Sequence, residues 1–281
     1  MKTIQVVEKT LPMAWEQAVV ACWEQGDSIP TQYDKPGDPA SRDVTVMIHV
    51  TEPLAEPRIH RAFPGGLADL EKYRAEVLYG VHDHWIRPQE GKWEYTYHDR
   101  LFNYRVPGLG EPINQIEQCI RLLRECGYTR RAQAVTWKAW EDAGIVDPAC
   151  LQRMFFRVQD GKLNLNVNMR SNDAFKAAFM NMYAFIELQK MVAGRLGVPV
   201  GEYVHIADSF HVYGSYFAEF EGFLKLIGSR RPEQRVWTTD AALPMFIEGC
   251  DALLAEEDMP EDSKALVRAR KAELEQMLVA V

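Results

Sequence analysis

Long hydrophobic runs are missing from this chain of 281 residues. No stretch reaches the roughly 18 apolar residues of a membrane-spanning helix, so none is predicted. The N-terminal residues MKTIQVVEKTLPMAWEQ lack the apolar core of a signal peptide, and we expect a cytoplasmic protein. With 47% hydrophobic and 26% charged residues, the composition is that of an ordinary globular protein.

Blocks of positive charge are also missing, and the net charge is −8. A protein that binds along a nucleic acid normally presents a basic surface, so we expect neither a nucleic acid nor a membrane as partner. An acidic balance still allows a few local arginines to hold a small anionic ligand.

Several signature motifs are absent as well. The chain has no GxGxxG, no Walker A motif and no G-x-S-x-G elbow, which argues against the common dinucleotide, P-loop and α/β-hydrolase sites. The five cysteines form no CxxC pair, and their odd number favours reduced thiols over a disulfide framework. His82-Asp83-His84 supplies one ligand pair without an obvious third ligand nearby, so no metal is predicted.

The patterns that are present predict one α+β domain over residues 1–281, with a mixed sheet packed against helices. Gly80 suits a helix C-cap, Asp160-Gly161 suits a hairpin turn, and the helix over 174–196 is apolar nearly all round, which implies burial. Helices are predicted over 12–26, 67–80, 113–126, 174–196 and 241–281. Extended segments are predicted over 43–51, 93–104, 132–140, 154–159, 162–170 and 201–215, and a loop over 27–42.

The strand LNLNVNMRSND at 163–173 has an unusual polar side. Leucine, valine and methionine alternate with Asn164, Asn166, Asn168 and Arg170, which is the period of a strand with one apolar face. Asparagine is normally depleted in strands. The polar face is either solvated or lines a polar cavity that needs hydrogen-bonding groups.

A thiol stands near the start of a predicted strand. Cys150 lies in DPACLQRMFF, in a loop after Pro148. A thiol at such a junction can be partly exposed, and a nearby arginine would lower its pKa and make it a nucleophile. A structural cysteine is the alternative interpretation.

Other polar residues suit a nucleotide. Asn181 lies in a helix that looks buried, and its carboxamide matches the NH and carbonyl edge of uracil; a core asparagine bonded to neighbouring backbone is the alternative. Arg42, Arg170-Ser171 and the pair Arg130-Arg131 offer the planar forks that bind phosphate, or else form surface salt bridges.

These residues, in this order, resemble the folate-dependent thymidylate synthases and their nucleotide hydroxymethylase relatives. The match runs from about residue 41 to 216 and is strongest over 147–216, which contains DPAC, DGKL, RSND and HVY. Its specific part is the spacing. Cys150 precedes Arg170 by twenty residues, Asp173 precedes Asn181 by eight, and His211 follows Asn181 by thirty.

The resemblance implies C5 one-carbon transfer to a pyrimidine nucleoside monophosphate, with 5,10-methylenetetrahydrofolate as cosubstrate and no metal. It implies that Cys150 adds to carbon 6 of the ring and that Asn181 reads the uracil edge. Glu76 would serve proton transfers, and Tyr97 would belong to the same water network.

The resemblance also assigns the phosphate contacts. Arg170 and Ser171 look like phosphate ligands, with Arg42 as a further one. Arg130 and Arg131 match an arginine pair that the family donates across a homodimer interface, so a homodimer with shared sites is expected.

The remaining contacts follow in the same way. His211 and Tyr213 look like the pair that binds the sugar hydroxyl, and Asp173 looks like a folate contact. All of these roles are implied by the resemblance.

Three features depart from the family pattern and leave the product open. Leu151 stands where the family usually has histidine, Phe155 stands where it has glutamine, and no Tyr-x-His-x-Pro-like tail is found. Water exclusion decides between hydride transfer, which gives a methyl group, and water attack, which gives a hydroxymethyl group. Conversion of dUMP to dTMP is the leading expectation. A dUMP, dCMP or CMP hydroxymethylase and an inactive nucleotide-binding relative are the alternatives.

Overall fold

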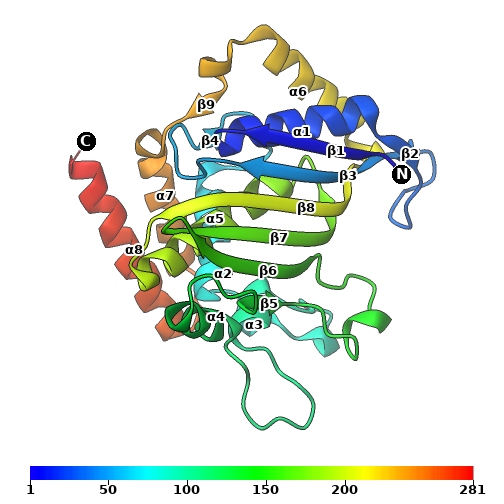
Figure 1. Cartoon of the computed structure of the whole chain (residues 1–281). Coiled ribbons are helices and arrows are strands. Elements are labelled where there is room, and N and C mark those ends of the chain that lie inside the picture. The colour runs from blue at the N-terminus through cyan, green and yellow to red at the C-terminus, as the bar shows by residue number, and fades with distance from the viewer. Residues whose placement is uncertain (281) are drawn as a thin grey trace.

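A mixed sheet forms the centre of the computed structural model, which describes residues 1–280 (Figure 1). Its strands are β1 (Thr3–Glu8), β2 (Asp27–Ile29), β3 (Ser41–Val50), β5 (Gln133–Val135), β6 (Leu151–Gln159), β7 (Lys162–Asp173) and β8 (Val200–Val212). They are ordered β1-β3-β8-β7-β6-β5, and β2 pairs with β3 outside this path. β1 is parallel to β3 and β7 to β8, whereas the other pairs are antiparallel. The predicted α+β class with a mixed sheet is confirmed.

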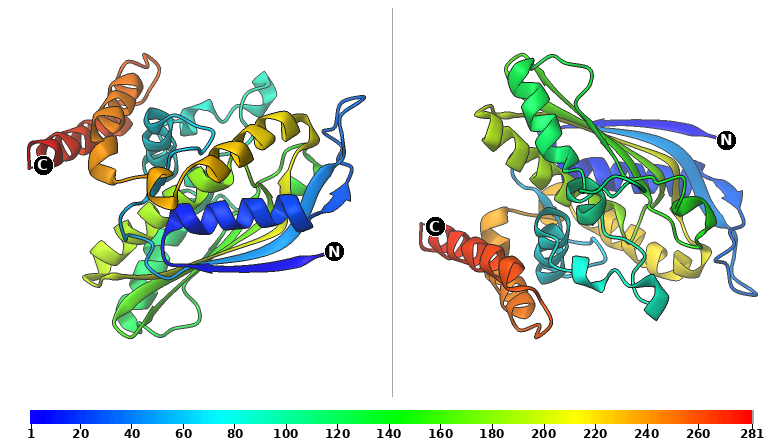
Figure 2. Two further views of the ribbon diagram at one scale, coloured as in Figure 1. Left: turned by 90° about the horizontal axis from the view of Figure 1, so that it is seen from above. Right: turned by 90° about the horizontal axis from the view of Figure 1, so that it is seen from below.

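The helices lie mainly behind this sheet. They are α1 (Leu11–Gln25), α2 (Leu67–Tyr79), α3 (Tyr97–Phe102), α4 (Gln115–Glu125), α5 (Ala178–Leu196), α6 (Phe217–Ser229), α7 (Thr239–Leu254) and α8 (Glu261–Ala280). The turned views in Figure 2 show α1, α2 and α5 on one side of the sheet. A small second sheet pairs β4 (Ile59–His60) with β9 (Val236–Trp237). No helix among residues 1–280 is both long and apolar enough to cross a bilayer.

Helix α5 is buried nearly all round, as its apolar composition predicts. Phe179, Phe185 and Leu188 on different sides of the helix are each almost fully buried, against the sheet and the surrounding helices. Helix α2 ends at Gly80 with φ 61°, the left-handed conformation that favours glycine. Both local predictions are therefore confirmed.

The hairpin between β6 and β7 is also confirmed. Its turn residues Asp160 and Gly161 have φ values of 51° and 74°, which is the pattern of a type I′ turn. This turn matches the twist of the flanking strands, so it fixes their register. Residues on either side of the turn then face each other along the whole hairpin.

Other boundaries were predicted wrongly. Residues 93–104 are not extended throughout, because Thr96 caps α3 by accepting a hydrogen bond from the Asp99 amide. Residues 132–140 form a strand only over Gln133–Val135, because the chain then turns to the Asp142 carboxylate. The predicted loop over 27–42 contains β2. Val281, the last residue of the predicted helix and domain, lies outside the described residues.

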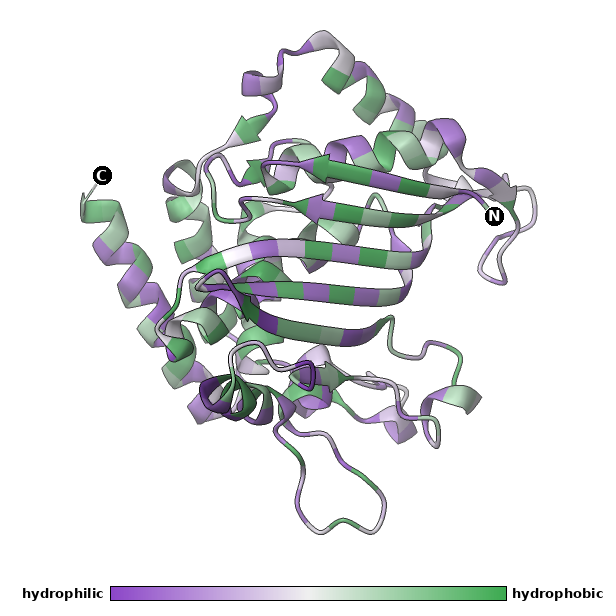
Figure 3. Cartoon of the chain, in the orientation of Figure 1, coloured by the Kyte–Doolittle hydropathy of each residue, from purple (hydrophilic) through white to green (hydrophobic). Residues whose placement is uncertain are grey.

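The asparagine side of β7 lies on the open face of the sheet, away from the buried leucines. Figure 3 shows the alternating hydropathy of successive residues along the strands. Asn164 Oδ1 accepts from the Glu202 amide at 2.9 Å, and Asn168 Oδ1 accepts from Arg153 Nη2 at 3.0 Å. These asparagines therefore bond to neighbouring strands, and Asn164 also lines a cavity of about 350 Å³.

Candidate active site

The hairpin brings Cys150 and Arg170 together. Because its turn lies midway between them, the Arg170 amide donates to the Cys150 carbonyl at 2.9 Å. Arg170 Nη2 lies 3.5 Å from Cys150 Sγ, and its Nε donates to the Ala149 carbonyl at 3.1 Å. The same guanidinium also donates to the Pro148 carbonyl. One arginine therefore holds the loop before β6 and places a positive charge beside the thiol.

The Cys150 thiol is half-buried. Burial raises its pKa above the ordinary value, while the Arg170 charge opposes the rise and Asp147 adds to it. The Arg170 charge does lower the pKa of Cys150, as expected. The prediction of a lowered pKa overall is wrong, because desolvation raises the pKa by more than Arg170 lowers it. In the unliganded protein Cys150 is a thiol at neutral pH, so a reaction through sulfur needs a proton acceptor.

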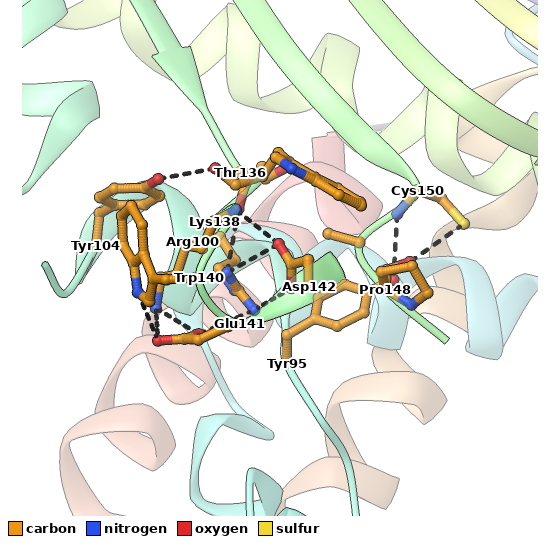
Figure 4. Close-up of polar contacts among 12 residues, drawn as sticks. Tyr95, Arg100, Tyr104, Thr136, Lys138, Trp140, Glu141, Asp142, Pro148 and Cys150 are labelled. Atoms are coloured by element: carbon orange, nitrogen blue, oxygen red, sulfur yellow. Dashed lines mark hydrogen bonds and ion pairs between the residues drawn. The ribbon is translucent and has the colours of Figure 1, made fainter. Parts of the chain in front are cut away.

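A buried ion cluster anchors the loop that leads to Cys150 (Figure 4). Arg100, 2% exposed, donates to the Asp142 carboxylate at 2.8 and 3.3 Å and to the Thr136 carbonyl at 3.2 Å. The Lys138 amide donates to Asp142 at 2.7 Å. The Thr136 hydroxyl also donates to the Leu151 carbonyl. These bonds fix the backbone on both sides of the loop, so the thiol has a defined position.

Three tyrosines surround this position. The Tyr95 hydroxyl accepts from the Cys150 amide at 3.4 Å, and the Tyr97 hydroxyl accepts from the Leu151 amide at 3.3 Å. The Tyr73 hydroxyl donates to Asn181 Oδ1. Tyr97 thus lies at the start of β6, and Tyr73 links α2 to Asn181 on α5.

A cavity of about 470 Å³ opens beside these tyrosines; we call it the Glu76 cavity. It is lined by Tyr73, Glu76, Lys92, Trp93, Glu94, Tyr95, Thr96, Tyr97 and Asp147. Glu76 Oε2 lies 3.1 Å from Nδ1 of His82, and the second ring nitrogen of His82 faces Glu256 at 3.3 Å. The cavity therefore combines a positioned carboxylate with four aromatic side chains, Tyr73, Trp93, Tyr95 and Tyr97.

Three neighbouring strands contribute polar residues to the same end of the sheet. His211 on β8 is paired with Asp43 on β3 and with Asp173 on β7, and Ser171 is paired with Ser209. Arg42 precedes Asp43 and is half-buried. The register thus gathers Arg42, Ser171, Asp173 and His211, which are far apart in the sequence, within a few residues of each other.

His211 is neutral and partly unsatisfied. Burial, aided by the Arg170 charge, lowers its pKa to about 4. Its Nδ1 lies 3.2 Å from the Ser209 hydroxyl, and its buried Nε2 has no hydrogen-bond partner in residues 1–280. The Tyr213 ring packs edge-on at 4.5 Å between centroids. A neutral imidazole with a free nitrogen can hydrogen-bond a hydroxyl group.

Asp173 combines a structural bond with a perturbed charge. Its Oδ1 accepts from the amides of Phe175 and Lys176 at 3.0 and 2.8 Å, which orders the entry to α5. Burial raises its pKa to about 6, although the two amides and the Lys176 charge oppose the rise. The carboxyl group can therefore exist in both protonation states near neutral pH.

Comparison with known proteins agrees with this arrangement. The family model described as thymidylate synthase matches residues 69–242. The chain belongs to the thymidylate synthase family. It is 30% identical over 217 residues to a protein of Methanosarcina acetivorans and 29% identical over 214 residues to one of Methanocaldococcus jannaschii, both provisionally named thymidylate synthase. These matches cover 77% and 74% of this chain and 93% and 90% of the relatives.

The fold agrees with the same family. Thermostable thymidylate synthase A from Bacillus subtilis superposes with a TM-score of 0.61 over 77% of this chain and 84% of that protein, at 20% identity. Members of the thymidylate synthase family are one-carbon transferases that use methylenetetrahydrofolate as cosubstrate. Within residues 1–280, no group of three metal-ligating side chains is found.

The structure does not bring Arg130 and Arg131 to Cys150. Both side chains are exposed in the segment before β5. The Phe156 amide donates to the Ala132 carbonyl, so this segment lies beside Phe156, six residues along β6 from Cys150. At about 3.3 Å per residue the separation along the strand is roughly 20 Å. Within one chain, these arginines are therefore remote from the thiol.

Sequence reasoning missed several residues that shape the site of this thymidylate synthase family member. Tyr73 lies three residues before Glu76, so helical spacing alone predicts that the two share a face of α2. Tyr95 precedes Tyr97 by two residues, and this close spacing to a predicted site residue is a signal from which Tyr95 could have been predicted. The Arg100–Asp142 ion pair joins distant segments and has no local signal.

Proposed function

We propose that this protein transfers a one-carbon unit from 5,10-methylenetetrahydrofolate to carbon 5 of dUMP and forms dTMP. The observation that carries the proposal is the Arg170 guanidinium 3.5 Å from Cys150 Sγ, at the fixed start of β6. A thiol nucleophile next to a phosphate-binding fork is the arrangement that covalent activation of a nucleotide requires.

Cys150 and Asn181 divide the work on the pyrimidine ring. The Cys150 thiol first gives its proton to water. The thiolate then adds to carbon 6 and moves its negative charge into the ring, which makes carbon 5 nucleophilic. Asn181 donates to the ring carbonyl where this charge develops. The cosubstrate, when bound, supplies the one-carbon unit and, for a methyl product, the hydride.

Other residues bind the nucleotide and move protons. Arg170 and Ser171 hold the phosphate with help from Arg42. His211 and Tyr213 hydrogen-bond the sugar hydroxyl. The neutral state of His211 and its unpartnered nitrogen support this assignment.

The cavity wall supplies the proton chemistry. Glu76, held by His82, is the proposed base for the carbon 5 proton, working through water near Tyr97. Asp173 contacts the folate from the entry of α5. Its pKa near 6 allows it to donate as well as accept a hydrogen bond.

A homodimer is proposed with the open face of the sheet as its interface. Met47, Ile206, Asn168 and Arg153 are paired in one row across β3, β8, β7 and β6. In Figure 1 no helix of residues 1–280 covers the face of the sheet that is turned to the viewer. Arg131, exposed and remote from its own thiol, would then serve the partner's site. This interpretation explains why the arginine pair has no ion-pair partner within the described chain.

Hydroxymethylation is the second candidate. The Glu76 cavity is lined by four charged side chains, namely Glu76, Lys92, Glu94 and Asp147. Charged walls retain water, and water attack on the one-carbon unit gives a hydroxymethyl product.

Mass analysis of the product formed from dUMP and methylenetetrahydrofolate separates the two candidates, because the methyl and hydroxymethyl products differ by one oxygen atom. Covalent trapping with 5-fluoro-dUMP separates both from a binding protein without turnover. Cys150→Ala should abolish turnover and trapping while dUMP binding, measured by calorimetry, is largely kept. Turnover by this variant at a tenth of the parent rate would overturn the proposed mechanism.

A further inference from the structure

Tyr73 connects helix α2 to the residue proposed to read the base. Its hydroxyl donates to Oδ1 of Asn181, which is only 5% exposed and belongs to α5. The ring of Tyr73 also lines the Glu76 cavity. The bond therefore lies at the boundary between the protein interior and the space that a ligand would occupy.

A carboxamide can be read in two ways. Its oxygen accepts and its nitrogen donates, and a half-turn of the side chain exchanges the two at almost the same positions. Asn181 Nδ2 donates to no other side chain within residues 1–280, so Tyr73 is the contact that distinguishes the two orientations. Burial raises the pKa of Tyr73 well above its ordinary value, with Glu76 adding to the rise, so the hydroxyl keeps its proton near neutral pH. Asn181 Oδ1 is its acceptor within residues 1–280, so turning the carboxamide over would leave this buried O–H without a partner.

We infer that Tyr73 is a positioning residue that sets the base preference of the site by fixing the orientation of the Asn181 carboxamide. The inference rests on the proposed function and goes one residue beyond it. With Oδ1 held by Tyr73, Nδ2 points to the position of a ring carbonyl, and the second lone pair of Oδ1 accepts from the adjacent ring NH. This pattern fits a pyrimidine with a 4-carbonyl group, as in uracil.

Cytosine presents the opposite pattern. Its ring nitrogen accepts and its 4-amino group donates, so a fixed Asn181 would place donor against donor and acceptor against acceptor. Without the Tyr73 hydroxyl, the carboxamide can turn over and satisfy cytosine. Loss of this hydroxyl should therefore weaken the discrimination between the bases more than it weakens binding itself.

The test compares dUMP and dCMP binding by calorimetry in Cys150→Ala protein, with and without Tyr73→Phe. The dissociation constant of dCMP divided by that of dUMP should fall about 3- to 10-fold, which is the effect of one hydrogen bond. Tyr79→Phe is the matched control, because Tyr79 lies on the same helix, and its ring, which packs 4.7 Å from the Arg74 guanidinium, is kept. In active protein, the preference for dUMP over dCMP, measured as the ratio of the two specificity constants, should also fall.

Each outcome has a distinct meaning. An unchanged ratio in folded Tyr73→Phe protein overturns the role of Tyr73 and leaves the proposed function intact. Parent protein that binds neither nucleotide overturns the proposed function and, with it, this inference. If Tyr73→Phe does not fold, Tyr73→Met is the second variant, because it also removes the hydroxyl and keeps a large apolar side chain. The same outcomes then apply to its ratio of dissociation constants. A fall in the ratio with Tyr79→Phe would assign the effect to helix α2 in general and overturn the inference.

Discussion

Replacement of Asp173 by asparagine should stabilise the unliganded protein at neutral pH. Burial raises the pKa of this carboxyl from 3.8 to about 6. Between these values the folded protein holds a proton that the unfolded chain has released, so the folding free energy contributed by Asp173 is lost as the pH rises from 4 through 6. Asparagine carries no charge and avoids this loss. Its side-chain oxygen can still accept from the amides of Phe175 and Lys176.

The magnitude follows from the shift. A change of about two pKa units at 1.36 kcal/mol each sets a ceiling near 3 kcal/mol, and we expect about 1–2 kcal/mol because the side chain is partly hydrated. The stability difference between Asp173→Asn and parent should be near zero at pH 4 and should grow to its full value at pH 7.

Urea unfolding followed by tryptophan fluorescence at pH 4, 5, 6, 7 and 8 measures this difference. Asp208→Asn is a suitable control, because Asp208 is an exposed aspartate on β8. A difference that does not change with pH, or a variant that is less stable than parent at pH 7, would refute the reasoning. The same variant should bind folate more weakly, which would separate the ligand contact from the stability of the fold.

Two further predictions concern the proposed sites. Cys150→Ala chains mixed with Arg131→Ala chains should regain about a quarter of the parent activity, because half of the randomly formed dimers contain one intact site; no recovery after confirmed subunit exchange would contradict a shared site. Asn181→Asp should shift the ratio of specificity constants from dUMP toward dCMP by a factor of ten or more, since a protonated carboxyl complements cytosine and leaves uracil groups unpaired. An equal ratio in both proteins would mean that Asn181 does not face the base.

Local signals in the sequence were sufficient for the parts of the fold that depend on neighbouring residues. The Asp160-Gly161 turn predicted the hairpin, and the hairpin alone accounts for the twenty-residue spacing between Cys150 and Arg170. The apolar composition of α5 predicted its burial, and Gly80 predicted the end of α2. In each case the local conformation and the final fold agree.

Contacts between distant segments and the burial of individual side chains could not be predicted from local signals in the sequence. The aromatic residues 93–104 looked extended, but a single cap at Thr96 starts a helix. The bond from Tyr73 to Asn181 joins positions 108 residues apart, and no periodicity predicts it. The net pKa of Cys150 depends on the balance between burial and the Arg170 charge, and burial cannot be read from the residue types alone.

In the β6–β7 hairpin, the turn that sets the register lies at one end and the proposed reactive residues lie at the other. The exposed turn at Asp160-Gly161 lies about ten residues, or roughly 33 Å, from Cys150 and Arg170. Added residues at the tip enlarge a loop whose closure entropy grows only slowly with length. The tip is therefore a suitable point to graft an affinity tag or a fluorescent reporter, because the paired strands keep the thiol and the guanidinium opposed.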